Sequence, residues 1–187
     1  FDTAIAYAER AGCRFDVRHA ANSAATLTNP RAAYDMVRPG LAIYGLSPVP
    51  ELGAPETFGL RPAMRLSAEI AIVKRVPANT GVSYAHTYTT SAPTSLVDVP
   101  VGYSDGIPRG GSNTGPVLVG GRRFTVAGRV CMDQFMVDVG DLVVDEGAQV
   151  VLFGAGTGGE PTAQEWAEAA GRSEERRVGK ECRALCR

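Results

Sequence analysis

The chain has 187 residues, of which 44% are hydrophobic and 7% aromatic, a composition typical of a globular protein with one or two domains. Its formal net charge is −1, and residues 1–171 carry 13 basic and 17 acidic groups, so no nucleic acid and no membrane surface is predicted as a partner. No apolar run reaches the roughly 18 residues of a transmembrane span, and no signal peptide opens the chain.

Helical character extends over Asp2–Ala11 and is expected to end at Gly12, before a short extended piece at Phe15–Val17. The same order of helix, strand and loop returns around Met36–Val37, which is the rhythm of βα units. Two such units are too few to close a barrel of about 250 residues. We therefore interpret residues 1–46 as the last βα units of a TIM-type barrel.

Residues 47–61 are rich in Pro, Gly and Glu without periodicity, which predicts a linker. Beyond them, apolar residues alternate with mostly polar ones over Met64–Ile72 and again over Val97–Val101. Two runs joined by Gly120 and Gly121 predict a β-hairpin. Further strands are expected over Val130–Val139 and Ala148–Phe153. The fold class is thus α/β followed by a mainly β domain over residues 62–171.

A capping box formed by Thr162 and Glu165 predicts a helix that ends at Gly171. Residues 172–187 have six basic and three acidic groups and no amphipathic period. We interpret this tail as a frameshifted or cloning-derived end, with a solvated native tail as the alternative.

Two loops predict an anion site. Asn22 and Ser23 lie in the run His19–Ala25, and Gly40 and Leu41 lie in the run Val37–Gly45. Each loop follows a strand-like piece and stands where a helix would start, so backbone N–H groups and a hydroxyl can converge on a phosphate. Arg38 adds a fixed planar charge that can donate to a ring nitrogen or a carboxylate.

Three further motifs follow in order: Val82–Tyr84, Gly102–Gly106 and Cys131–Asp133. Taken singly, each has an ordinary explanation, since a lone tyrosine in a β-rich domain is usually a packing residue. We assign that packing role to Tyr7, Tyr44 and Tyr88, and a loop role to His86. Together with the anion loops, however, the order and spacing of the motifs resemble those of alanine racemases over almost all of residues 1–171.

That resemblance implies an enzyme that uses pyridoxal 5'-phosphate (PLP) to interconvert L-alanine and D-alanine by two-base proton transfer. It implies that Tyr84 is one of the two bases and works on the cofactor of the partner subunit in a homodimer. An unperturbed phenol has a pKa near 10, so nearby positive charge would have to favour the phenolate. D-alanine would feed peptidoglycan synthesis in the cytoplasm.

On the cofactor side, the resemblance places Arg38 against the pyridine nitrogen of PLP, with His19 bracing that arginine. The remaining implied cofactor-binding residues are Asn22, Ser23, Gly40 and Leu41.

On the substrate side, the resemblance implies that Tyr103 and the backbone N–H of Met132 hold the substrate carboxylate near the partner's site. Asp133 would order this loop, which also contains Cys131, and Arg109 would line the substrate entryway. Without a histidine partner, Cys131 is expected to be unreactive packing. The four cysteines have neither zinc spacing nor a dense disulfide pattern, so no metal site and a reducing compartment are predicted.

A PLP racemase also requires a lysine that forms the internal Schiff base and acts as the second base. The chain has only Lys74, in an alternating strand, and Lys180, in the tail, and neither matches the family's lysine motif. The family's histidine partner of the tyrosine, its carboxylate-gripping arginine and its late phosphate-binding tyrosine also have no counterpart. We therefore expect this chain alone not to racemise alanine.

Three alternatives stand beside this interpretation. The parent protein could racemise another amino acid, such as serine or lysine, or the chain could be a non-catalytic PLP-binding module. A serine hydrolase based on Ser23 and His19 is a poor fit, because no Gly-x-Ser-x-Gly elbow and no orienting acid are present.

Overall fold

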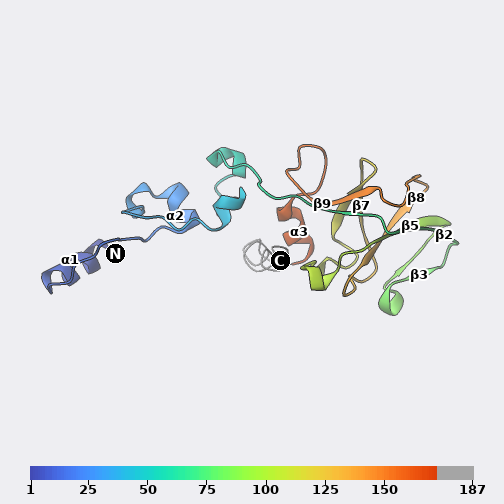
Figure 1. The fold of residues 1–187 in the computed structure, drawn as a ribbon, viewed down its shortest axis with the longest axis horizontal. Coiled ribbons are helices and arrows are strands. Elements are labelled where there is room, and N and C mark those ends of the chain that lie inside the picture. Colours follow the sequence, from blue (N-terminus) through green and yellow to red (C-terminus); the bar gives the residue numbers. More distant parts are fainter. Residues whose placement is uncertain (172–187) are drawn as a thin grey trace. The chain divides into compact units, whose positions relative to one another are not determined.

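The structure, a computed structural model, describes residues 1–171 of the chain. The tail predicted over 172–187 lies outside these residues. Contacts divide the chain into two compact units, Phe1–Arg61 and a second unit that begins at Pro62 (Figure 1). No helix among the described residues is both long and apolar enough to cross a membrane.

Unit 1, residues 1–61, contains short helices and no named strand. Its elements are α1 (Asp2–Arg10), α2 (Ser23–Thr28) and the 3-10 helices Pro30–Ala32, Leu41–Tyr44 and Pro55–Phe58. The prediction of α1 is confirmed, and Gly12 ends it with a φ of +88° that suits a residue without a Cβ.

The extended pieces expected at Phe15–Val17 and Met36–Val37 do not form strands. One parallel bridge, between Asn22 and Arg38, is the only β pairing of the described part of unit 1. A strand exists through hydrogen bonds to a neighbouring strand, and a local sequence pattern cannot supply that neighbour.

Residues 47–61, expected as a linker, cluster by contacts with unit 1. They include the 3-10 helix Pro55–Phe58 and the buried side chains of Ser47 and Val49. The Ser47 hydroxyl donates to the carbonyl of Gly53 at 2.9 Å, which gives the segment local order.

Unit 2 is built on strands. These are β1 (Leu66–Glu69), β2 (Ile72–Val76), β3 (Gly81–Val82), β4 (Tyr88–Thr89), β5 (Thr94–Val99), β6 (Pro116–Val119), β7 (Arg122–Ala127), β8 (Phe135–Gly140) and β9 (Gln149–Phe153). Helix α3 (Ala163–Ala169) and the 3-10 helices Tyr84–His86, Tyr103–Asp105 and Arg109–Gly111 complete it.

Seven strands form one antiparallel sheet in the order β1-β9-β6-β7-β8-β5-β2, and β3 pairs only with β4. The alternating run Met64–Ile72 was expected as one strand, but it divides. The N–H of Ile70 bonds to Ala148 beside β9, whereas the N–H of Ala71 bonds to Asp98 of β5. Because consecutive residues join the two end strands, the sheet curls on itself.

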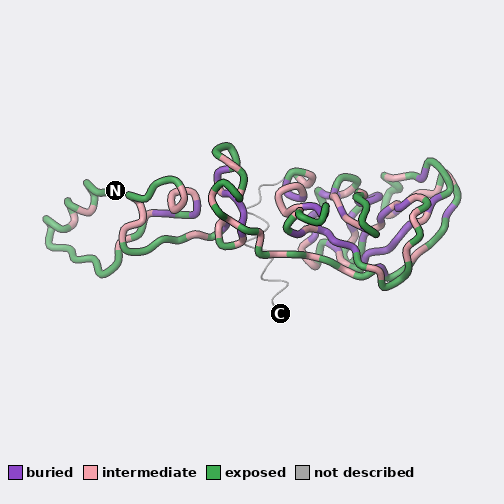
Figure 2. Tube along the Cα trace, turned by 90° about the horizontal axis from the view of Figure 1, so that it is seen from above, coloured by how far each residue is buried: buried purple, intermediate pink, exposed green. Residues whose placement is uncertain are grey.

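One face of this curled sheet encloses the main core, and Figure 2 shows most of the buried segments in unit 2, with shorter ones in unit 1. Fourteen buried apolar side chains form it, among them Val97, Val137, Phe135 and Trp166. A smaller cluster of Val76, Val82, Leu96 and Ala127 is separate from it. Burial of each such side chain stabilises the fold by about 1.5–3 kcal/mol.

The hairpin predicted at Gly120–Gly121 is confirmed. It joins β6 to β7, and its two glycines have φ values of +55° and +76°, as a two-residue turn with right-handed strand twist requires. The strand expected over Val130–Val139 is shorter than predicted, since β8 begins at Phe135. Residues 131–134 form a turn instead, closed by a bond from Cys131 N–H to the Gln134 carbonyl.

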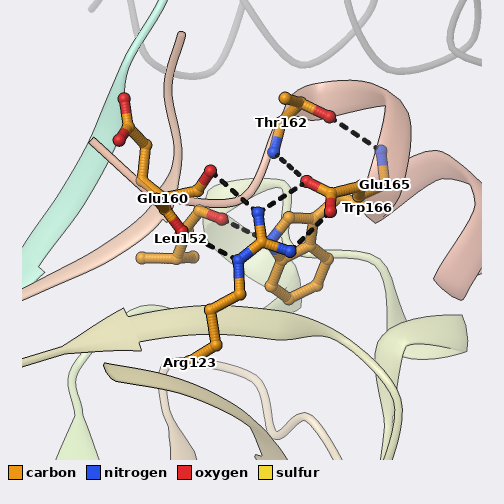
Figure 3. Close-up of polar contacts among 7 residues, drawn as sticks. Arg123, Leu152, Glu160, Thr162, Glu165 and Trp166 are labelled. Atoms are coloured by element: carbon orange, nitrogen blue, oxygen red, sulfur yellow. Dashed lines mark hydrogen bonds and ion pairs between the residues drawn. The ribbon is translucent and has the colours of Figure 1, made fainter. Parts of the chain in front are cut away.

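Helix α3 begins at the predicted capping box, in which the Thr162 hydroxyl and the Glu165 carboxylate each accept the other residue's N–H. Gly171 has the left-handed φ expected of it, +59°. Figure 3 shows how the helix is attached: the Trp166 indole donates to the Leu152 carbonyl at 2.6 Å, and Arg123 reaches Glu165 with two nitrogens. Strand and helix are thereby joined by both apolar packing and charge.

Candidate active site

In unit 1 the two predicted anion loops lie together. The bridge between Asn22 and Arg38 aligns them, and the Ala42 N–H donates to the buried Ser23 hydroxyl at 3.3 Å. Asn22 caps α2 by accepting the Ala25 N–H at 3.0 Å. The backbone N–H groups at the starts of two short helices therefore neighbour one hydroxyl.

Open space lies beside these loops. A Cβ built on Gly40 would meet no atom within 4 Å, and Leu41, which follows it, is buried and anchors the turn. The Arg38 guanidinium is exposed and donates to the Ala20 carbonyl at 3.4 Å. These donors, an always-protonated guanidinium among them, suit a phosphorylated ligand.

His19 is exposed, and it lines a surface cavity with apolar residues of α1 and with Phe15 and Val17. No hydrogen bond joins His19 to Arg38 among residues 1–171. The bracing role that the resemblance implies for His19 therefore stays a prediction.

In unit 2 Tyr84 stands on the loop between β3 and β4 and is 71% exposed. It lines an open pocket of about 470 Å³ with Ser83 and the run Cys131–Gln134. Met132, in the same pocket, is 56% exposed. The structure thus brings together the Val82–Tyr84 and Cys131–Asp133 motifs, which are nearly fifty residues apart in sequence.

The third motif joins the same loop through backbone hydrogen bonds. The Tyr103 N–H donates to the Cys131 carbonyl at 2.9 Å, and the Ser104 N–H and hydroxyl both donate to the Met132 carbonyl, at 2.8 and 2.7 Å. A Cβ at Gly102 would lie 2.4 Å from atoms of Cys131 and Met132. Only glycine permits this approach, so Gly102 is required for the two loops to meet.

Arg109 lies close to Tyr103, with its guanidinium carbon 5.5 Å from the centre of the tyrosine ring. A cation at this distance is attracted by the ring's quadrupole. Both side chains are exposed, so they present a charged and aromatic surface to whatever binds there.

Asp133 has a buried acidic neighbour. Asp98 on β5 is buried, and its Oδ1 has no hydrogen-bond partner among the described residues. Burial first, and the negative charge of Asp133 second, raise the pKa of the Asp98 carboxyl.

Sequence reasoning missed two residues of this pocket, Ser83 and Gln134. The Ser83 hydroxyl donates to the Arg129 carbonyl at 2.8 Å and lies 3.3 Å from the Cys131 sulfur. Ser83 also has a positive φ of 61°, and nothing in the local sequence signals it. Cys131, expected as packing, is half-buried at the edge of the pocket.

Two sequence profiles match the chain. The one described as "Alanine racemase, C-terminal domain" matches residues 63–179, and the one described as "Alanine racemase, N-terminal domain" matches residues 1–48.

Curated relatives share this similarity. The alanine racemases of Frankia casuarinae and Streptomyces coelicolor are 60% and 59% identical over 171 residues, which is 91% of this chain and 44% of each relative. The chain therefore spans less than half the length of the relatives it matches.

Solved structures agree. The alanine racemase from Streptomyces coelicolor superposes with a TM-score of 0.89 and 56% identity over 95% of this chain and 47% of that one. The Bacillus anthracis alanine racemase, solved with bound L-Ala-P, gives a TM-score of 0.84 and 35% identity, covering 94% of this chain and 45% of that one. The chain has the alanine racemase fold, in which a β-rich domain follows part of a barrel, and it belongs to the alanine racemase family.

Proposed function

We propose that the chain is the C-terminal part of a PLP-dependent racemase that interconverts L-alanine and D-alanine. The observation that carries this proposal is the pocket shared by Tyr84, Cys131, Met132 and Asp133, in a chain whose relatives at 57–60% identity are alanine racemases.

The loops of unit 1 fit the phosphate and ring of PLP. Ser23 and the backbone N–H groups around Gly40 and Leu41 would hold the phosphate, because the two loops lie together. The space next to Gly40 is also open, since a Cβ built there would meet no atom within 4 Å. Arg38 would donate to the ring nitrogen. When bound, PLP supplies an electron sink that lowers the cost of removing the substrate's α-proton.

Tyr84 would exchange that proton through its hydroxyl. Because the Tyr84 side chain is 71% exposed, its hydroxyl can reach a site on another subunit. This exposure supports a homodimer whose active sites are shared between subunits. The Met132 N–H and Tyr103 would bind the substrate carboxylate, with Asp133 ordering the loop and Arg109 lining the approach. We place the reaction in the cytoplasm, where D-alanine is required as a peptidoglycan precursor.

The test is a chimera in which residues 1–171 replace the matched segment of the Streptomyces coelicolor alanine racemase. The purified chimera, loaded with PLP, is expected to form D-alanine from L-alanine, measured by chiral chromatography. Serine and lysine are assayed in parallel as competing substrates. A folded chimera that binds PLP but racemises none of the three amino acids would favour the non-catalytic binding module and contradict the proposal.

Replacing Tyr84→Phe in the chimera removes one hydroxyl and is expected to lower kcat by about 100-fold or more, the range of a lost acid-base group. The visible absorbance of bound PLP should be unchanged. Tyr7→Phe, an equal change at an exposed tyrosine of α1, is the control and should leave kcat within twofold. Full activity of the Tyr84→Phe chimera would remove Tyr84 from the reaction.

The 187-residue chain by itself is expected to give no turnover with added PLP. Lys74 lies exposed on β2 and does not match the family's lysine motif, so we do not expect it to serve as the second base. Clear PLP-dependent racemisation by the isolated chain would contradict this expectation.

A further inference from the structure

The loop that carries Tyr84 has an unfavourable backbone. Ser83, Ala85 and His86 all have positive φ, at 61°, 62° and 46°. Ser83 combines its φ with a ψ of −172°, in a region that residues other than glycine rarely adopt. Such a conformation persists only where the surroundings determine it, so the direction in which Tyr84 projects must depend on contacts elsewhere in the hairpin.

Those contacts lie on the second face of the sheet. Val82 of β3 is 3% exposed and packs with Val76, Leu96 and Ala127, while the ring of Tyr88 on β4 packs against the same cluster. Val82 and Tyr88 are register partners in the hairpin. The residues on each side of the Tyr84 loop, Val82 and Tyr88, therefore pack against the same apolar cluster on the sheet.

Tyr88 also makes a hydrogen bond beside this apolar cluster. Its hydroxyl donates to Oδ2 of Asp138 on β8 at 2.8 Å. The carboxylate is itself held from the sheet, because Oδ1 accepts the Gly140 N–H at 3.0 Å and the hydroxyl of Thr94 on β5. These two donors fix the carboxylate, and the fixed carboxylate in turn determines where the Tyr88 hydroxyl binds.

The two tyrosines of the hairpin differ in their surroundings. The pKa of Tyr88 is raised to about 12, mainly because the hydroxyl is partly buried and also because it donates a hydrogen bond to Asp138. Tyr88 therefore stays protonated, and keeps donating, throughout the pH range in which an enzyme's acid-base group must exchange protons.

We propose that Tyr88 is a positioning residue for the reaction: its hydroxyl, held on Asp138, sets the placement of the loop from which Tyr84 reaches the substrate's α-carbon. The inference rests on the proposed racemase function and deepens it. Tyr88 does not touch the substrate, and it acts only through Tyr84.

The test uses the PLP-loaded chimera with Tyr88→Phe, which keeps the packed ring and removes only the hydroxyl. Misplacement of a reacting group by a fraction of an ångström slows the step it performs, so kcat should fall about 10-fold with KM within about twofold. The isotope effect of α-deuterated substrate should rise in the direction in which Tyr84 removes the proton and fall towards unity in the reverse direction.

Two controls separate positioning from stability. Glu160→Gln disturbs hydrogen bonds to Gly156 and Gly158 in the turn before α3, outside the hairpin and its contacts with Asp138, so it should lower the melting temperature with kcat and both isotope effects within about twofold. Tyr7→Phe should change neither stability nor kinetics.

The proposal is overturned if Tyr88→Phe changes only the melting temperature, if both isotope effects change alike, or if Glu160→Gln reproduces the kinetic effect. Should Tyr88→Phe fail to fold, Asp138→Leu removes the acceptor of the Tyr88 hydroxyl and carries the test. The same split between the two directions is expected, and unchanged kinetics would overturn the proposal. An unmodified chimera that is inactive would instead count against the racemase function itself.

Discussion

Ala85, the residue after Tyr84, has φ 62° and ψ 11°, which is left-handed backbone. An alanine in this conformation is strained because its Cβ crowds the chain, whereas glycine adopts it freely. The side chain of Ala85 is exposed and outside both apolar clusters. Nothing in its packing therefore compensates for the strain.

We expect Ala85→Gly to stabilise the folded chain by up to about 1 kcal/mol, with the greater freedom of glycine in the unfolded chain offsetting part of the gain. Urea denaturation of the 187-residue chain measures this as a higher midpoint. Thr87→Gly, a change two residues later in the same loop at a residue outside the positive-φ set, is the control and should lower the midpoint. A lower midpoint for Ala85→Gly would show that the left-handed conformation is not strained in this loop.

One buried carboxylate, that of Glu160, holds the turn that precedes α3. Glu160 precedes the helix and is 8% exposed, and its two oxygens accept the N–H groups of Gly156 and Gly158 at 3.1 and 2.8 Å. A Cβ at Gly158 would lie 2.8 Å from this carboxylate. Backbone hydrogen bonds, opposed by burial, lower the pKa of Glu160 below its ordinary value of 4.5.

A carboxyl whose pKa is lower in the folded state stabilises the fold above its ordinary pKa, and this contribution disappears as the pH falls through the folded value. Glu160→Gln should therefore lower the denaturation midpoint near pH 7, because its amide oxygen can accept only one of the two N–H groups and its amide nitrogen cannot accept the other. The difference from the parent should shrink as the pH is brought below about 4.5. Midpoints measured from about pH 3 to pH 8 test this.

Gln164→Glu serves as the comparison for Glu160→Gln, since it changes one charge on an exposed face of α3, next to Glu168, without touching the Gly156–Glu160 turn. Its effect should have a different pH dependence, because repulsion between neighbouring carboxylates weakens on protonation. If the difference in denaturation midpoint between Glu160→Gln and the parent stays constant or grows at low pH, the Glu160 carboxylate does not stabilise the turn.

The two units differ in how completely they bury their own apolar residues. Unit 2 encloses a core of fourteen buried side chains. In unit 1 several large apolar side chains remain exposed, among them Phe1, Phe15, Val17 and Ile43. Because apolar burial is the main favourable contribution to folding, unit 1 is the less stable of the two when the chain is isolated.

Limited proteolysis of the 187-residue chain should accordingly cleave within residues 1–61 before it cleaves within 62–171. Mass spectrometry is expected to show a protected fragment that begins near residue 62. Early cleavage inside β5 or β8, with residues 1–61 intact, would contradict this ranking of stability. The β3–β4 loop around Tyr84 is the site in unit 2 where a first cut is expected, since its residues 84–87 are exposed.

Much of the local structure could be predicted from the sequence, because its causes are local. Helix α1 with Gly12, the Gly120–Gly121 hairpin and the capping box of α3 were each expected and are each observed. The apolar pattern of the sequence also located β5 and β9. It failed for Phe15–Val17, and it overran β8 at residues 131–134, because hydrogen-bond partners distant in sequence decide where a strand exists.

Of the candidate site, the sequence determined which residue types could hold a phosphate, bind a carboxylate or exchange a proton, and the order of its motifs identified their family. Only the tertiary structure brought Tyr84 into one pocket with Cys131 and Met132 and revealed the Tyr88–Asp138 hydrogen bond. The division has a physical origin. Capping and turn preferences act between residues a few positions apart, whereas the pocket exists because tertiary contacts bring the loop after β3 beside the turn at residues 131–134, nearly fifty residues later in the chain.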